Sequence, residues 1–295
     1  MWSQIAQKIS EATGEKFTIN QQRSVGGGCI NQGYALIGEN KTYFIKLNSA
    51  SLVEMFAAEA LGLKQMYATQ TIRIPQPICW GMVDNSAFLV MEWLELGRGA
   101  NSESWEEMGQ KLAAMHQFEG AKQFGWERNN TIGSTPQVNT WTDNWSEFFA
   151  HHRIGFQLRL AKRRGGSFPD TGKVIAAVEQ LLKDHHPQPS LVHGDLWSGN
   201  AAVTESGEPV ILDPATYWGD REVDLAMTEL FGGFPASFYR GYNQAWQLDS
   251  GYQQRKDLYN LYHILNHFNL FGGGYENQAM KMIAKILRYN TVFAF

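Results

Sequence analysis

Apolar residues in the first ninety positions occur mostly in short runs that alternate with polar residues, a spacing typical of half-buried β-strands. Turn-forming residues separate five such runs, which predict strands at residues 17–25, 33–37, 42–47, 78–83 and 87–93. Two other stretches space their apolar residues three or four positions apart and predict helices at residues 2–13 and 52–67. The N-terminal third of the chain should therefore form a small antiparallel sheet with one main helix.

From residue 101 onward the apolar spacing becomes that of helices. Asn101 or Ser102 can cap a helix that runs to about Phe118. Further helices are predicted at residues 141–162, 169–184, 235–246, 252–271 and 275–289. The whole pattern indicates an α+β protein with a small sheet lobe, residues 1–94, and a larger, mostly helical lobe, residues 95–295.

The segment from residue 191 to residue 225 interrupts the helical pattern and carries candidate chemistry. An apolar pair precedes Asp195, two short β-prone runs follow Asn200, and Asp213 ends the second run. Two carboxylates and one carboxamide therefore lie at loop positions on adjoining strands. Oxygen ligands of this kind suit a hard cation such as Mg²⁺.

Composition limits the classes of protein to consider. The 295 residues are 43% hydrophobic and 13% aromatic, which is enough for a sizeable core. The net charge of −4 does not favour a nucleic-acid partner. The chain has no run of 18 apolar residues, so no membrane span is expected, and its N-terminal helix lacks a signal-peptide core. Two cysteines, Cys29 and Cys79, give neither a disulfide framework nor a metal site, and a reducing cytoplasm is expected.

The spacing after residue 192 is that of a known catalytic loop. HGD at residues 193–195, followed by Asn200, resembles the protein-kinase pattern H-R-D-x-x-x-x-N with Gly in place of Arg. DPA at residues 213–215 stands where protein kinases have D-F-G. Together these features are similar to kinase-like phosphotransferases of small molecules. The alternative is that the polar residues only form turns and cap strands.

The sheet lobe carries a second feature of that pattern. Lys46 lies inside an apolar strand, where its charge is costly unless it is paired, and Glu59 on the following helix is a candidate partner. A strand Lys held by a helix Glu and directed at the α- and β-phosphates is the kinase arrangement. Alternatively, Lys46 faces water at a sheet edge, and Glu54 competes as the partner.

A glycine-rich turn precedes this strand. Gly26, Gly27 and Gly28 permit close backbone approach, which suits amides that point at phosphates. The turn matches neither G-x-x-x-x-G-K-[ST] nor G-x-G-x-x-G, so a plain flexible hairpin is the alternative.

The segment after the fifth strand resembles the hinge between kinase lobes. There the backbone of Glu92 and Leu94 would pair with the adenine edge, and Met91 would border the base. An ordinary strand exit is the alternative. The chain lacks the Phe of D-F-G and an evident activation segment, so regulation by loop phosphorylation is not expected.

Longer strings point to one family. Nearly the whole chain is similar to the fructosamine/ketosamine-3-kinases, close to their bacterial branch. The strings HGDLWSGN and DPATYWGDREVDLA separate this family from aminoglycoside and choline kinases. The strings that carry the resemblance lie at residues 26–31, 88–92, 134–137, 139–141, 193–200 and 213–226. The resemblance implies a protein-kinase-like bilobal fold and ATP-dependent phosphorylation of the sugar 3-hydroxyl of a ketosamine in deglycation. The acceptor would be a ribulosamine, erythrulosamine or fructosamine, free or on a protein side chain.

This resemblance and the chemistry of phosphoryl transfer assign roles to the candidates. Asp195 would be the catalytic base, and Asn200 and Asp213 would hold Mg²⁺. Lys46, kept in place by Glu59, would steady the phosphates of ATP.

Other residues of the same strings would contact the substrate or support the loops. Trp197 would lay its face on the sugar and on a cationic amine, with core packing as the alternative. Some family members are thought to use a thiol in the nucleotide loop as a redox brake, and Cys29 would have that role unless it is merely a small buried thiol. Further substrate contacts are expected from Tyr217, Trp218, Asp220, Arg221 and Glu222, and structural roles from His193 and Asp224.

Two other functions stay open at this point. The protein could be a kinase-like phosphotransferase for another small amine or alcohol, such as an aminoglycoside or choline. A non-enzymatic nucleotide-binding module is disfavoured, because a degenerate kinase would have lost one of Lys46, Asp195, Asn200 and Asp213. The sequence leaves open the preferred ketosamine and the oligomeric state.

Overall fold

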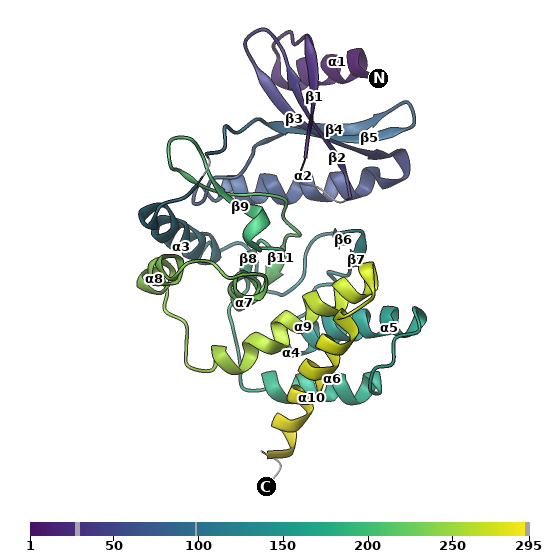
Figure 1. The fold of residues 1–295 in the computed structure, drawn as a ribbon, viewed down its shortest axis with the longest axis vertical. Coiled ribbons are helices and arrows are strands. Elements are labelled where there is room, and N and C mark those ends of the chain that lie inside the picture. Colours follow the sequence, from purple (N-terminus) through teal and green to yellow (C-terminus); the bar gives the residue numbers. More distant parts are fainter. Residues whose placement is uncertain (27–29, 98, 293–295) are drawn as a thin grey trace.

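A computed structural model describes residues 1–26, 30–97 and 99–292 (Figure 1). The N-terminal part is a five-stranded antiparallel sheet in the order β1-β2-β3-β5-β4. Its strands are β1 (Gln21–Val25), β2 (Gln32–Ile37), β3 (Thr42–Ser49), β4 (Pro77–Val83) and β5 (Ser86–Glu92). Its helical elements are α1 (Trp2–Thr13), the short 3₁₀ turn η1 (Ala50–Leu52) and α2 (Val53–Ala68).

The two faces of this sheet pack against different helices. Ile45 and Val90 pack in one cluster with Ile5 and Ile9 of α1. Leu89 packs in another cluster with the apolar residues of α2. Because side chains alternate between the faces of a strand, Lys46 falls on the α2 face, between Ile45 and Leu47. Figure 1 shows α2 lying between the sheet and the rest of the molecule.

The C-terminal part is mostly helical. Its short strands form three two-stranded units, β6 with β7, β8 with β11 and β9 with β10. These strands are β6 (Asn130–Ile132), β7 (Thr135–Gln137), β8 (Ser190–Val192), β9 (Ala201–Val203), β10 (Pro209–Ile211) and β11 (Tyr217–Gly219). The helices are α3 (Ser102–His116), α4 (Trp145–Phe148), α5 (Phe156–Arg163), α6 (Thr171–Leu182), α7 (Glu222–Leu230), α8 (Ala236–Ala245), α9 (Tyr252–Phe271) and α10 (Tyr275–Val292).

The α+β fold with a small antiparallel sheet and a larger helical part is confirmed. The division at residue 94 stays a prediction. The caps agree in detail, since the Asn101 side chain accepts a hydrogen bond from the Ser104 amide at the start of α3. Among the described residues, no helix combines the length and apolar character needed to span a membrane.

Several expected elements differ from the structure. The first strand is confined to β1 and does not begin at residue 17. The long helix expected at 141–162 is broken by a π-helical turn, η2 (Phe149–Gly155), between α4 and α5. The hairpin β6–β7 lies between two of the expected helices, and the string after Asp213 forms β11 and α7. Short strands and π turns depend on tertiary partners, which hydrophobic spacing does not report.

Helices α3 and α8 lie side by side and touch through two glycines (Figure 1). A Cβ atom on Gly109 would lie 2.1 Å from the Phe238 carbonyl oxygen. A Cβ atom on Gly241 would lie 2.0 Å from the Glu106 carbonyl oxygen. No side chain larger than hydrogen fits at either position without moving one helix.

Replacing Gly241 by Ala should therefore destabilise the protein. Helix propensity alone would favour Ala by about 1 kcal/mol, but an approach of 2.0 Å to a backbone oxygen should cost about 3 kcal/mol, the upper end of the range for overpacking. The net loss of about 2 kcal/mol should lower the melting temperature by about 4–8 °C, measured by thermal denaturation. Gly274→Ala is the matched control, because its Cβ would meet nothing within 4 Å. An unchanged or higher melting temperature for Gly241→Ala would contradict this packing.

Candidate active site

The catalytic loop leaves β8 through a backbone that only glycine fits. Gly194 has a φ of +81°, and a Cβ atom on it would lie 2.2 Å from the Ala215 carbonyl oxygen. The Ala215 amide also donates to the His193 carbonyl at 2.8 Å, so the loops carrying Asp195 and Asp213 are in direct backbone contact. The Gly that stands in place of the kinase Arg is thus explained by this crossing.

A buried carboxylate on α7 holds the same loop. Asp224 accepts hydrogen bonds from the amides of His193, at 2.7 Å, and Gly194, at 2.8 Å. Its Oδ2 also lies 3.0 Å from His116 Nε2. Burial opposes the charge, but these hydrogen bonds and the nearby imidazoles hold the pKa of Asp224 below its usual value. Asp224 thus has the position expected of a residue that supports the catalytic loop.

His193 points away from solvent and joins the two strands that carry the acids. Its Nε2 lies 2.8 Å from the Leu212 carbonyl oxygen, and its Nδ1 accepts from the Asp195 amide at 3.2 Å. These partners require the neutral tautomer that is protonated at Nε2. Burial lowers the pKa of His193, in agreement with a neutral ring.

Asp195 lies near two other carboxylates and is partly exposed. Burial, followed by the charges of Asp213 and Asp224, raises its pKa to about 8. The Asn200 side chain donates to the Asp195 carbonyl oxygen at 2.9 Å and lies 3.4 Å from its Oδ2. A carboxylate with a pKa in this range can take up a proton near neutral pH, as a general base must.

The predicted ion pair between Lys46 and Glu59 is present. Lys46 Nζ lies 2.6 Å from Glu59 Oε1 and 2.5 Å from Asp213 Oδ1, so one buried ammonium bridges β3, α2 and the loop after β10. Burial opposes its charge, but the two carboxylates raise the pKa of Lys46. The Lys46 charge is the main reason that the pKa of Asp213 is lowered, whereas burial raises that of Glu59 to about 6.

The side chains of Asn200 and Asp213 fit a hard cation. Asp213 has a φ of +56° and a side chain that is 55% exposed, and its charge acts on the nearby Asp195. Asn200 donates through Nδ2, which leaves its carbonyl oxygen available as a ligand. An amide oxygen beside carboxylates is a donor set that Mg²⁺ accepts, and the excess negative charge here favours a divalent cation.

Helix α2 also directly touches the chain that follows Asp213. A Cβ atom on Gly62 would lie 2.7 Å from Thr216 Oγ1, so α2 and the chain after Asp213 are in contact through a glycine. The helix that carries Glu59 is therefore fixed against the loop that carries Asp213.

The predicted nucleotide contacts lie only partly within the described residues. Gly26 is described, whereas Gly27, Gly28 and Cys29 lie outside the described residues. Met91 is buried and Leu94 is half-buried.

Glu92 holds the hinge through both its backbone and its side chain. Its amide donates to the Gln76 carbonyl at 2.8 Å, and its carboxylate binds Arg73 and the Gln76 amide. These bonds tie the end of β5 to the segment that precedes β4.

Trp197 is the one predicted substrate residue at the surface beside the catalytic loop. Its side chain is 39% exposed, and its ring lies over Gly199, where a Cβ would be only 2.3 Å from the indole. Its ring is thus held against the backbone of the catalytic loop and open to a ligand.

The other predicted substrate residues lie inside the C-terminal part. Tyr217 and Trp218 belong to β11 and are buried, with the Trp218 ring against Gly120. Asp220 accepts hydrogen bonds from Tyr259 and His185, each at 2.6 Å. This placement differs from the expected substrate contact, because β11 pairs with β8 and turns these side chains into the core.

Glu222 and Arg221 likewise have partners of their own. Both Glu222 oxygens lie 2.7 Å from the guanidinium of Arg255. Arg221 donates to the Trp246 carbonyl and lies 3.7 Å from the centre of its ring. Both residues fix the start of α7, and with it Asp224, rather than facing the Asp195 loop.

Sequence reasoning gave no function to several buried polar residues around the two loops. His116 bridges Asp224 and Tyr242. Arg153 is fully buried on the π-helical turn. Its position among apolar residues in the sequence could have indicated a buried, paired charge. Gln137 and Asn139 lie in strings that mark the family, but no chemistry could be read from them.

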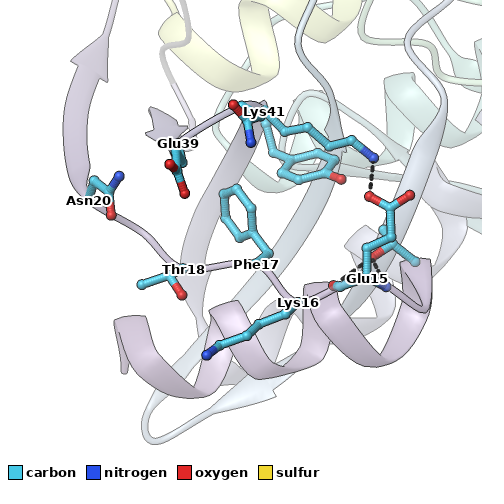
Figure 2. Close-up of a pocket in the computed structure, with 10 residues that line it drawn as sticks. Glu15, Lys16, Phe17, Thr18, Asn20, Glu39 and Lys41 are labelled. Atoms are coloured by element: carbon cyan, nitrogen blue, oxygen red, sulfur yellow. Dashed lines mark hydrogen bonds and ion pairs between the residues drawn. The ribbon is translucent and has the colours of Figure 1, made fainter.

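A separate polar hollow lies at the outer end of the sheet. Figure 2 shows Lys16, Phe17 and Thr18, which follow α1, facing Glu39 and Lys41 of the β2–β3 turn. Lys41 is paired with Glu15 at 2.5 Å across it. Helix α1, whose last residue Thr13 borders the hollow, lies at the opposite end of the sheet part from β8 and β9 (Figure 1).

The fold and this set of Lys, Glu, Asp and Asn side chains define a kinase-like phosphotransferase. The chain matches the fructosamine kinase family over residues 1–289 and belongs to that family. It is 63% identical to a protein of Synechocystis sp. named for ketoamine kinase activity, over 97% of each chain. It is 42% identical to the chloroplastic protein-ribulosamine 3-kinase of Arabidopsis thaliana, over 93% of this chain and 85% of that one.

Solved structures agree with this assignment. A crystal structure from Haemophilus somnus named for fructosamine-3-kinase has a TM-score of 0.92 at 33% identity and covers 97% of this chain and 98% of that chain. A spectinomycin phosphotransferase crystallised with ADP has a TM-score of 0.57 at 14% identity, covers 99% of this chain and 94% of that chain, and shares the fold alone. The predicted family and the predicted kinase class are therefore confirmed.

Replacing Asp195 by Asn should stabilise the protein at neutral and alkaline pH. The raised pKa means that the folded state holds this proton more tightly than the unfolded chain, so folding stability falls as pH rises from about 4 to about 8. Asn removes that loss. In magnesium-free buffer, we expect the melting temperature of Asp195→Asn to exceed that of the wild type by several degrees near pH 8 and by less near pH 5. A difference that does not change with pH would rule out the raised pKa.

Proposed function

We propose that the protein transfers the γ-phosphoryl group of ATP to the sugar 3-hydroxyl of a ketosamine, free or attached to a protein side chain. The observation that carries the proposal is the bridge formed by Lys46 between Glu59 and Asp213, beside Asp195. The relatives named for ketoamine kinase and protein-ribulosamine 3-kinase support the choice of acceptor. A ribulosamine, an erythrulosamine and a fructosamine are the candidate substrates in a deglycation reaction.

ATP and Mg²⁺ would bind between the two parts of the chain. Asn200 and Asp213 would hold Mg²⁺, which neutralises the charge of the transferring phosphoryl group. Lys46, oriented by Glu59, would bind the α- and β-phosphates. ADP in the spectinomycin enzyme supports nucleotide binding by the fold.

The hinge and the glycine turn would complete the nucleotide site. The backbone of Glu92 and Leu94 would pair with the adenine, and Met91 would border the base. The turn from Gly26 to Gly28 would cover the phosphates with its amides.

Asp195 would act on the acceptor. Its carboxylate orients the 3-hydroxyl and accepts its proton as the phosphoryl group transfers. Burial and the two neighbouring acids raise its proton affinity in the free protein. A divalent cation on Asp213 would remove one of those charges and leave Asp195 ionised when the nucleotide is bound.

Trp197 would form one wall of the acceptor site. Its exposed ring offers a face for a sugar and for the protonated amine of a ketosamine, through a cation–π contact. We place the reaction in a reducing cytoplasm, since the sequence has only two cysteines. A redox role for Cys29 stays a prediction.

The test is ATP consumption with Mg²⁺ against a ribulosamine, a fructosamine, an aminoglycoside, choline and a free pentose. We expect turnover only with ketosamines, and a fall of about 10²–10⁴ in kcat for Asp195→Asn, because the base is lost. ADP affinity of the variant, measured by calorimetry, should stay within about twofold of the wild type.

Other outcomes would change the proposal in different ways. Turnover with the aminoglycoside or choline alone would move the activity to another acceptor. Full activity of Asp195→Asn on a ketosamine would exclude Asp195 as the base.

A further inference from the structure

The backbone that carries Asp213 is in an uncommon conformation. Its φ of +56° lies in the left-handed region, which residues with a Cβ atom rarely adopt. A residue keeps such a conformation only where its surroundings fix it.

Two carbonyl groups of the same loop are held by side-chain amides of the β6–β7 hairpin. Gln137 Nε2 donates to the Ala215 carbonyl at 3.0 Å. Asn130 Nδ2 donates to the Thr216 carbonyl at 2.8 Å. The hairpin lies beneath α2 and close to β11 (Figure 1). The backbone of Ala215 and Thr216 is thus bound to the β6–β7 hairpin.

The hydrogen bonds leave these amides one orientation each. The Ala215 carbonyl can only accept, so it requires Gln137 Nε2 on its side, and Gln137 Oε1 then accepts from the Tyr262 hydroxyl at 2.7 Å. Asn130 Oδ1 accepts from Gln137 Nε2 at 2.9 Å and from Asn139 Nδ2 at 2.8 Å, so its own Nδ2 must face Thr216. We call Asn130, Gln137 and Asn139 the amide cluster.

A buried cation fixes the far end of the amide cluster. Arg153 donates to Asn139 Oδ1 at 2.7 Å and to the Val138 carbonyl at 2.6 Å. Its guanidinium lies 4.1 Å from the ring centre of Tyr217 and 4.6 Å from that of Phe148. The positive charge polarises the chain of amides that ends on the Thr216 carbonyl, which strengthens each bond in the chain. The π-helical turn directs Arg153 into this position.

We propose that the amide cluster is a positioning device for Asp213, which sets the orientation of its carboxylate for the metal-bound nucleotide. This inference rests on the proposed role of Asp213 in holding Mg²⁺. The cluster bonds neither Lys46 nor Glu59 and ends on the backbone just after Asp213. Its loss should therefore weaken the coupling between Mg²⁺ and the nucleotide more than nucleotide binding itself.

The test uses Asn130→Ala and Gln137→Met, with Asn269→Ala as the matched control. The side-chain amide of Asn269 also donates to a backbone carbonyl in the C-terminal part, that of Gln157, at 3.0 Å. It makes no hydrogen bond to the residues that follow Asp213. ADP affinity is measured by calorimetry with Mg²⁺ and with EDTA, and thermal melts show that each protein is folded.

The wild type and Asn269→Ala should bind ADP at least about tenfold more tightly with Mg²⁺ than with EDTA. We expect Asn130→Ala and Gln137→Met to lose most of that ratio while their affinity in EDTA stays within about twofold. kcat on a ketosamine should fall by about 10–100-fold in both variants. If Gln137→Met does not fold, Asn130→Ala, whose side chain is only half-buried, carries the test.

Two results would overturn the inference. The first is that both variants keep the wild-type ratio of ADP affinity with Mg²⁺ to ADP affinity with EDTA. The second is an equal loss of ADP affinity with and without Mg²⁺, which would make the amide cluster a general scaffold. Asp213→Asn separates a failure of the metal role itself. If that variant keeps the wild-type ratio, Asp213 does not hold Mg²⁺, and the proposed function and this inference fail at that residue together.

Discussion

The architecture of the site depends on one backbone crossing, at which Gly194 lies against the Ala215 carbonyl. Because no Cβ fits there, the loops that carry Asp195 and Asp213 approach more closely than any other residue would allow. Next to the crossing, β8 pairs with β11. The amides of His193 and Gly194 also donate to Asp224, which holds the Asp195 loop in place. Asp195 and Asp213, which are separated in the sequence, are thus brought near each other by one close backbone contact.

The crossing also brings together more negative charge than the site can keep unpaired. Asp195, Asp213 and Asp224 lie close enough to raise the proton affinity of the first. Lys46 is shared between Glu59 and Asp213, and His116 supports Asp224. This charge is costly to a free protein and useful to one that receives a divalent cation with its nucleotide. Folding stability and chemistry therefore make opposite demands on Asp195.

Those site residues whose role depends on their neighbours in the sequence could be predicted from it. The Lys46–Glu59 pair followed from a charge inside an apolar strand, and the catalytic loop followed from the spacing of Asp195 and Asn200. The placement of Asp220 and Glu222 did not follow, because pairing of β11 with β8 turns them toward Arg255 and Tyr259. Periodicity of 3.6 residues also could not show the π turn that directs Arg153 into the core.

The contact of Gly62 with Thr216 has a consequence for control of the enzyme. In protein kinases the helix that carries the Glu partner of the Lys can rotate outward, and its position switches activity on and off. Here that helix lies directly on the chain after Asp213, with only a hydrogen atom between its backbone and the threonine side chain. An outward rotation of α2 would have to break this contact, so the packing of Gly62 on Thr216 opposes that movement and keeps Glu59 in place relative to Asp213.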